Sequence, residues 1–271
     1  GYMVGKKVFI LGSGDIGLIM ARRLTLEGAK VLGVAELMPY SNGLNRNIVQ
    51  CLNDFNIPLY LSHTIVKIHG EKRVTGITVA KVDERMNPIP GTEFDIECDT
   101  VLLSVGLIPE NELSRNLDLD MYPLTTGPMV DQHRETSLDG FFAAGNVVHV
   151  HDLVDFVAEE SLIAGKYAAL KAQGKLSADV RTVKVNAIDG VRTCVPQRVT
   201  LPAEIPDDEK IKLYMRVGAP HRKVKLEIKS GDKLLLSKPL PVAKPSEMIA
   251  VEIPKAKFAE IGEEISVGLV L

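Results

Sequence analysis

The chain is poor in cysteine and has no long apolar run, and both absences narrow its class. Its 271 residues include three cysteines, none close enough to another to form a CxxC pair. Neighbouring cysteines therefore supply neither a zinc knuckle nor a redox dithiol. No run approaches the roughly 20 apolar residues that cross a bilayer, and no secretory signal pattern is present. We therefore expect a cytoplasmic protein without a membrane span.

Several catalytic and binding motifs are also missing. The sequence contains no GxSxG nucleophile motif and no P-loop. Residues 181–271 carry 16 Lys/Arg against 12 Asp/Glu, but the charges are interspersed rather than clustered. This distribution is typical of a solvated face, so we expect no nucleic-acid site. Cys51 and Cys98 lie in apolar patterns and are predicted to be core residues rather than nucleophiles.

What the sequence does contain is a glycine turn between two apolar segments. Lys7–Leu11 is an apolar run typical of a strand buried in a parallel sheet, and Val31–Ala35 is a second one. Between them, the turn Gly12–Gly17 leads into a helical pattern over Asp15–Glu27. We expect the apolar face of this helix to contain Ile16, Ile19, Met20 and Leu24.

Each glycine of this turn has a physical task in dinucleotide binding. Gly12 permits the tight turn, Gly14 lets the backbone approach a pyrophosphate, and Gly17 allows close packing of helix on strand. The helix N-terminus offers free N–H groups to phosphates, and an acid after the second strand binds the adenosine ribose and disfavours a 2′-phosphate. The predicted NAD(H) site comprises Gly12, Ser13, Gly14, Asp15, Ile16, Gly17 and Glu36. The alternative is a glycine-rich turn in another kind of α/β protein.

The rest of residues 5–106 completes one nucleotide-binding unit. Leu44–Phe55 has the apolar spacing of a helix, and Leu59–Ile65 is a strand candidate. Thr100–Val105 is again an apolar run suited to a parallel sheet. Three alternating segments before it predict an antiparallel meander: Thr64–His69, Arg73–Asp83 and Thr92–Cys98.

After residue 106 the pattern changes twice. Phe141–Ala144 is predicted to be a short strand and Leu153–Ala172 a helix. Beyond Val180, short alternating runs separated by Gly and Pro turns predict a small antiparallel sandwich. Its seven predicted strands are Thr182–Ile188, Arg198–Leu201, Lys210–Val217, Lys223–Ile228, Lys233–Leu236, Ile249–Ile253 and Glu264–Leu271.

Three stretches, in this order, resemble the FAD-dependent pyridine nucleotide-disulfide oxidoreductases. They are the glycine turn with Glu36, CDTVLLSVGLIPE (98–110), and TSLDGFFAAGN (136–146) with the helix that follows. The resemblance covers residues 5–172. It implies an NAD domain inserted into an FAD domain, with hydride passing from NADH to FAD. The stretch AGNVVHVHDLVDFVAEE (144–160) is most similar to bacterial flavoproteins encoded beside glycerol-3-phosphate dehydrogenases.

The resemblance also implies roles for particular residues. Gly106 would lie against the nicotinamide half of NAD. Gly145 and Asn146 would contact the ribityl-phosphate part of FAD, although the family usually has Asp where Asn146 stands. Val154 and Asp155, at the start of a helix, would face the flavin pyrimidine, where a helix dipole favours negative charge.

Two departures from the family qualify the expected function. The family's FAD fingerprint belongs before residue 1, so we expect a fragment with an incomplete FAD site that is inactive alone. No cysteine pair is present, so the electron acceptor is not expected to be a disulfide and stays unidentified, with a partner flavoprotein as one candidate. The predicted fold class is α/β with a trailing all-β part. Its domains are an NAD(H)-binding Rossmann-like domain (1–106), the C-terminal part of an FAD-binding domain (107–175) and a β-sandwich-like domain (176–271).

Other functions are left open by the sequence. His149 and His151, with Asp152, Asp155, Glu159 and Glu160, have the ligand types of a metal site, but we favour a polar loop rimming a cofactor pocket and predict no metal. The remaining histidines, including His133, are predicted to lie on the surface or in loops. We predict no catalytic side chain. The rival functions are a non-catalytic NAD(H)-binding or scaffold module and a flavin-free dehydrogenase using Tyr214 or His221.

Overall fold

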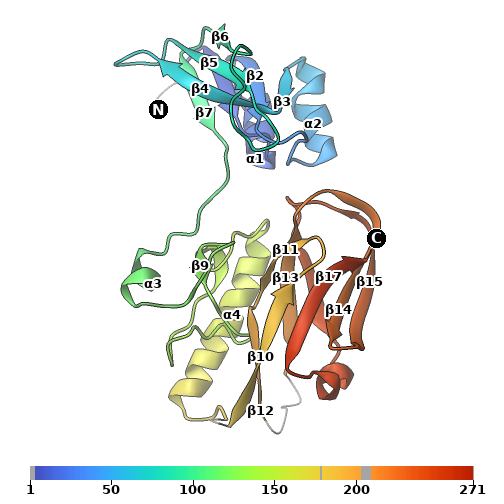
Figure 1. The fold of residues 1–271 in the computed structure, drawn as a ribbon. Coiled ribbons are helices and arrows are strands. Elements are labelled where there is room, and N and C mark those ends of the chain that lie inside the picture. Colours follow the sequence, from blue (N-terminus) through green and yellow to red (C-terminus); the bar gives the residue numbers. More distant parts are fainter. Residues whose placement is uncertain (1–3, 178, 203–208, 271) are drawn as a thin grey trace. The chain divides into compact units, whose positions relative to one another are not determined.

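The chain forms two compact units, residues 1–106 and residues 107–271. The computed structural model describes residues 4–177, 179–202 and 209–270, and Figure 1 shows their helices and strands. Within these residues, no helix is both long enough and apolar enough to cross a membrane. Each unit is described by itself below.

Unit 1 is built on a parallel sheet. Its strands are β1 (Lys7–Leu11), β2 (Lys30–Glu36), β3 (Leu59–Leu61) and β7 (Thr100–Leu103), in the order β3-β2-β1-β7. All three pairings in this sheet are parallel. The predicted strands on either side of the glycine turn are therefore confirmed, and their carboxyl ends meet at one edge of the sheet.

Both faces of this sheet are covered. Val8 and Ile10 of β1 pack into a core with the helices on one face, whereas Phe9 packs into a second core on the other. The helices are α1 (Asp15–Leu26), α2 (Asn45–Cys51) and the 3₁₀ turn η1 (Asn53–Phe55). The opposite face is covered by the antiparallel meander β4 (His63–His69), β5 (Gly76–Lys81) and β6 (Phe94–Ile96), as predicted. Burial on both faces explains why β1 has no polar alternation.

Three local predictions in unit 1 are wrong. α1 buries Leu18, Ala21 and Leu24, whereas Ile16 and Ile19 are exposed. The predicted helix Leu44–Phe55 divides into α2 and η1. The predicted strand Leu59–Ile65 divides at Ser62, whose φ of 54° lies in the left-handed region and cannot continue a strand.

Unit 2 begins with irregular chain and one long helix. Its first elements are α3 (Glu112–Asn116), β8 (Met121–Tyr122), β9 (Gly127–Pro128), η2 (Gly145–Val147) and α4 (Val154–Ala172). The α4 prediction is accurate to one residue. The predicted strand Phe141–Ala144 is wrong, because only an isolated bridge from Glu135 to Phe142 forms there among the described residues.

The remainder of unit 2 consists of two sheets around one core. Their strands are β10 (Val180–Ala187), β11 (Val191–Val195), β12 (Arg198–Pro202), β13 (Ile211–Val217), β14 (His221–Ser230), β15 (Lys233–Ala243), β16 (Ile249–Ile253) and β17 (Glu264–Val270). A 3₁₀ turn, η3 (Lys255–Glu260), precedes the last strand. The sheet orders are β12-β10-β17-β14-β15 and β11-β13-β16.

The sequence missed one strand and one pairing direction in this region. β11 was not predicted, and β10 pairs with β17 in parallel although an antiparallel arrangement was expected. Leu271, the predicted end of the last strand, lies outside the described residues.

Strand β13 joins the two sheets to the helical part of unit 2. Its residues Leu213 and Met215 are buried in the core between the sheets. The alternate residues Lys212, Tyr214 and Arg216 contact the other side: Lys212 and Tyr214 bond the Glu159 carboxylate on α4, and Arg216 bonds the 150–152 loop. Because successive side chains of a strand point to opposite faces, one face of β13 packs in the core between the sheets and the other contacts α4 and the 150–152 loop.

Candidate functional site

The first candidate site is the glycine turn after β1. Gly12 has a φ of +100°, and a Cβ there would lie 2.0 Å from the Ser104 carbonyl oxygen. A Cβ on Gly17 would lie 2.6 Å from the Gly12 carbonyl oxygen. The chain itself therefore requires glycine at both positions, because the turn and α1 pack directly on the segment after β7.

Gly14 differs from the other two glycines of the turn, Gly12 and Gly17. Its φ is −64°, an ordinary value, and a Cβ built on it meets nothing within 4 Å. It is the N-cap of α1, and no side chain caps that helix terminus. The open space over Gly14 and the uncapped N–H groups are what a bound pyrophosphate needs, so these residues fit a dinucleotide.

Glu36 lies at the end of β2, but its carboxylate is largely occupied by its own chain. Oε2 accepts hydrogen bonds from the Ser13 backbone N–H at 3.0 Å and from the Ser13 hydroxyl at 2.5 Å. Oε1 accepts one from the Met38 N–H at 3.0 Å, and the residue is 5% exposed. A carboxylate has about four acceptor positions, so one on Oε1 is left for a ribose hydroxyl.

Two other residues of the predicted NAD(H) site point elsewhere. The Asp15 carboxylate accepts bonds from the Leu44 N–H at 2.8 Å and the Asn47 side chain at 2.6 Å, so it fixes the start of α2. Ile16 is 71% exposed. Gly106, with a φ of +93° and nothing within 4 Å of its Cβ position, ends unit 1.

The residues predicted to face FAD lie around η2 and the start of α4. Gly145 is buried with a φ of +73°, and Asn146 beside it is exposed. Val154 and Asp155 form the exposed first turn of α4, which has no side-chain cap. Uncapped N–H groups and an exposed amide side chain are suitable for contacts to a phosphate or a flavin edge, so these residues fit the group.

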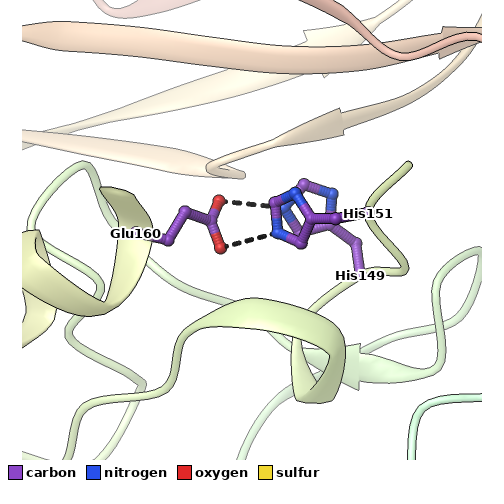
Figure 2. Close-up of side chains that lie close together, drawn as sticks. All are labelled: His149, His151 and Glu160. Carbon is purple, nitrogen blue, oxygen red and sulfur yellow. Dashed lines mark hydrogen bonds and ion pairs between the residues drawn. The ribbon is translucent and has the colours of Figure 1, made fainter. Parts of the chain in front are cut away.

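A buried polar cluster is bonded to this segment, and Figure 2 shows three of its side chains, His149, His151 and Glu160. Glu160 is the only buried residue that α4 contains. Its Oε1 lies 2.9 Å from His149 Nε2 and its Oε2 lies 3.0 Å from His151 Nε2. Oε2 also accepts the Gly145 N–H at 3.0 Å. The two histidines were expected on a pocket rim, but their side chains are only 8% and 0% exposed.

The sequence did not reveal the cation of this cluster, Arg134. It is 1% exposed, its φ of 72° is unusual for a non-glycine residue, and its guanidinium lies 3.1 Å from Glu160 Oε1. The guanidinium carbon also lies 5.6 Å from the centre of the Tyr214 ring, a cation–π distance. No local pattern marks Arg134, because its partners are far away in the sequence.

Burial and charge shift the protonation equilibria in this cluster. Burial lowers the pKa of His149 below its ordinary value of 6.5, and this outweighs its bond to Glu160. Burial alone would raise the pKa of Glu160, but bonds from His149 and His151 and the charge of Arg134 outweigh it, so that pKa lies far below 4.5. The folded protein therefore holds Glu160 ionised and His149 neutral near pH 7.

His133 was also predicted to be a surface or loop residue, and that prediction is wrong. Its Nε2 lies 2.8 Å from Glu209 Oε1, its ring stacks on Tyr167 with centroids 3.6 Å apart, and its side chain is 13% exposed. The three cysteines are all buried, and burial raises the pKa of Cys194 to about 12. Buried thiols of this kind are unreactive.

The parallel sheet, its glycine turn and the open space at Gly14 define a dinucleotide-binding α/β protein. Comparison with known proteins then gives the family. The sequence profile described as "Pyridine nucleotide-disulphide oxidoreductase" matches residues 2–160, more than half of the chain. This protein belongs to that family, as the three sequence motifs indicated.

Individual relatives are more distant. The chain is 27% identical over 178 residues to an NADH oxidase of Methanocaldococcus jannaschii, covering 64% of this chain and 36% of that protein. It is 25% identical over 189 residues to the small chain of glutamate synthase [NADPH] of Azospirillum brasilense, covering 65% and 39%. The chain thus spans less than half the length of these curated relatives.

A solved structure gives the same class of fold. The crystal structure of T. acidophilum thioredoxin reductase matches with a TM-score of 0.53 and 27% sequence identity, over 62% of this chain and 53% of that one. The likeness supports an α/β flavoprotein fold of the thioredoxin reductase type.

Proposed function

We propose that this chain is the NAD(H)-binding and C-terminal portion of an FAD-dependent oxidoreductase that passes hydride from NADH to FAD and on to an unidentified acceptor. The observation that carries the proposal is the open space at Gly14. Gly12 and Gly17 are glycines because the chain's own packing requires it, whereas nothing in unit 1 excludes a side chain at Gly14. A bound pyrophosphate would exclude one.

The choice of NADH over NADPH rests on Glu36. Its negative charge lies beside the glycine turn, where it would repel a 2′-phosphate. Gly106 would lie near the nicotinamide half, by resemblance to the family.

The FAD contacts we propose are made by Gly145, Asn146, Val154 and Asp155, all near the start of α4. When bound, FAD supplies the hydride acceptor, and the protein binds and orients it. No side chain of this chain is proposed as a general acid or base.

We further propose that the FAD site is incomplete here, because α4 has an uncovered apolar face. Val154 and Leu162 are 77% and 76% exposed, and the small residues Ala158 and Gly165 on the same face are exposed too. An apolar face of this kind needs a partner. We assign it to the remainder of the FAD-binding domain, with residues 107–175 as its trailing part and 176–271 as a separate β-sandwich-like domain. A cytoplasmic location and a partner flavoprotein as acceptor stay predictions.

Gly14→Val tests the nucleotide site. Because the Cβ introduced at this position would meet no atom of the chain but would contact a pyrophosphate, we expect the thermal midpoint to be nearly unchanged. NADH affinity should fall more than about tenfold, or ~1.4 kcal/mol, in a fluorescence titration. Gly12→Ala is the matched contrast: it should destabilise the fold, since its Cβ would clash with Ser104. Unchanged NADH affinity in Gly14→Val would refute the site.

The visible absorption spectrum of the purified chain tests the flavin part. We expect a colourless protein that binds one NADH and reduces FAD only when the rest of the FAD-binding domain is present. A yellow protein would show that the FAD site is complete in this chain. Unit 1 is compact by itself, which favours a non-catalytic NAD(H) module as the second candidate. NADH binding without flavin reduction in the completed protein would support that candidate.

A further inference from the structure

We propose that Glu160 is a positioning residue: by accepting three hydrogen bonds and pairing with Arg134 it fixes the segment 145–151 in the conformation that meets FAD, and it does so without a metal. The FAD part of this inference rests on the proposed function. The hydrogen-bond part rests on the structure alone and is tested separately.

The first step concerns the partners of the Glu160 carboxylate. Oε1 contacts His149 Nε2 at 2.9 Å, and Oε2 accepts a hydrogen bond from the Gly145 N–H and lies at hydrogen-bond distance from His151 Nε2, both at 3.0 Å. The Arg134 guanidinium forms an ion pair with Oε1 at 3.1 Å. Three of about four acceptor positions of the carboxylate are therefore used by hydrogen bonds, and its charge is paired. Glu160 itself is 0% exposed, so water does not compete for these positions.

The second step concerns the loop that these bonds hold. Two of the three donors, the Gly145 N–H and His151 Nε2, lie at its two ends and bond the same oxygen, Oε2. Within the loop, the Asn146 side-chain oxygen accepts the His151 N–H at 3.0 Å. The loop is therefore closed around Glu160, and Asn146 is presented outward at the position where FAD contacts are expected.

The third step weighs a metal ion against hydrogen bonds. The ligand atoms of His149, His151 and Glu160 all lie within 4.8 Å of one another, close enough to bind a metal. However, a metal would need the lone pairs of both Nε2 atoms, which instead lie at hydrogen-bond distance from the carboxylate. A divalent ion would also be buried beside the positive charge of Arg134. Only the single negative charge of Glu160 would balance these positive charges, and uncompensated buried charge is costly. Without a metal, the charges of Arg134 and Glu160 balance each other.

The fourth step is the tautomer that this arrangement demands. If both imidazoles donate from Nε2, then Nδ1 of each neutral ring is a bare acceptor. For His151 this atom is buried and has no partner among the described residues. Because the ionised Glu160 carboxylate only accepts hydrogen bonds, both rings must carry a proton on Nε2 to bond it.

Imidazole ¹⁵N NMR of the wild-type protein tests the hydrogen-bond part, and it requires no substitution that could unfold the chain. We expect Nε2–H signals from His149 and His151 near pH 7, unchanged by ZnCl₂ or by EDTA. Metal-shifted resonances, a zinc-dependent rise in the thermal midpoint, or Nδ1–H tautomers at both residues would overturn the proposal and indicate a metal site.

Glu160→Gln tests the positioning part in the protein completed with the rest of its FAD-binding domain. One amide oxygen cannot accept all three donors, and the amide lacks the charge that pairs with Arg134, so we expect the Kd of FAD, from quenching of flavin fluorescence, to rise about tenfold or more. The Kd of NADH should change less than about twofold. Glu159→Gln is the matched control, because Glu159 is the adjacent residue, pairs with Lys212 and is partly exposed. It should change neither constant.

The outcomes separate the two proposals. If the wild-type protein completed with the rest of its FAD-binding domain does not bind FAD, the proposed function and the positioning role both fail, while the NMR result still decides between hydrogen bonds and a metal. If wild type binds FAD and Glu160→Gln binds it equally well, the positioning role fails and the proposed function stands. Should the variant not fold, Arg134→Met with Glu160→Leu restores charge balance but leaves the Gly145 N–H unpaired, and the same loss of FAD affinity is expected.

Discussion

Glu36 is a buried carboxylate with a structural role, and we propose that it also determines nucleotide specificity. Three of its four acceptor positions bind Ser13 and Met38, so it fixes the turn that precedes α1. We propose that the remaining position on Oε1 binds the ribose. A change at Glu36 is therefore expected to alter both the turn and the nucleotide preference, and the two effects must be measured separately.

We predict that Glu36→Gln reduces the preference for NADH over NADPH, because the charge that repels a 2′-phosphate is removed. It should also lower the free energy of unfolding by about 1–3 kcal/mol, since its amide group cannot accept all three buried donors. The ratio of the two nucleotide dissociation constants and urea unfolding measure these effects. Ser13→Ala is the control: it loses one hydrogen bond to Glu36 but keeps the charge, so it should keep the preference. Unchanged selectivity in Glu36→Gln would remove Glu36 from the ribose role.

For single residues, the sequence predicts a role where the partners are close in sequence. The glycine turn was recognised because Gly12, Gly14 and Gly17 act within six positions of one another. The two hydrogen bonds from Ser13 to Glu36 were not predicted, because no local pattern shows that side chains 23 positions apart bond each other. Arg134 was missed for the same reason, although His149, His151 and Glu160 had been grouped as one cluster of polar residues.

Among the elements, α4 is unusual because its one buried residue is an acid. The helix is otherwise held to unit 2 by charged groups at its edge, such as Glu159, which Lys212 and Tyr214 bond. Its attachment therefore combines partly buried apolar residues, such as Phe156 against Tyr214, with polar contacts to β13.

We predict that unit 2 loses stability in acid in two stages. The folded pKa of His149 is below 6.5, so below that pH the unfolded chain binds a proton that the folded chain excludes. The unfolding free energy should then fall by up to about 1.4 kcal/mol per pH unit. Glu160, whose folded pKa is also depressed, adds a second loss as pH falls below 4.5. The charge of Arg134 acts on both groups, lowering the pKa of each.

Urea unfolding followed by circular dichroism at a series of pH values measures both stages. His149→Gln is the control, because its amide can still donate to Glu160 but does not titrate. It should flatten the first stage and leave the second. A wild-type stability that rises on acidification from pH 6.5 would contradict the assignment of a neutral His149.

The strands show where a sequence pattern stops being informative. Alternation predicted most of the strands of unit 2, but it does not specify partners, so the parallel pairing of β10 with β17 could not be foreseen. Phe141–Ala144 is apolar like a strand, yet it forms only the isolated bridge between Phe142 and Glu135 and no strand pairing. Apolar character there reflects packing of irregular chain in unit 2, where Ala143 contacts the small core around Val130 and Val148.

The whole molecule consists of two units that differ in what stabilises them. Unit 1 has its own cores on both faces of a parallel sheet. In unit 2, the segment before residue 176 depends on the sheets that follow: Gln132 bonds the Thr200 backbone, Arg216 bonds the Val150 carbonyl and Arg198 bonds the Thr136 carbonyl. The two parts of unit 2 should therefore fold together.

Deleting residues 176–271 tests this difference. We predict that NADH binding survives, because the glycine turn, Glu36 and both cores of unit 1 are untouched. Residues 107–175 should lose their structure, since the deletion removes the partners of Gln132 and the β13 face that covers Arg134 and Glu160. Calorimetric titration with NADH and hydrogen exchange of α4 give the two readings on one sample. Loss of NADH binding would mean that the β domain contributes to the nucleotide site, and protected α4 amides would mean that the buried Glu160 cluster is stable without Tyr214.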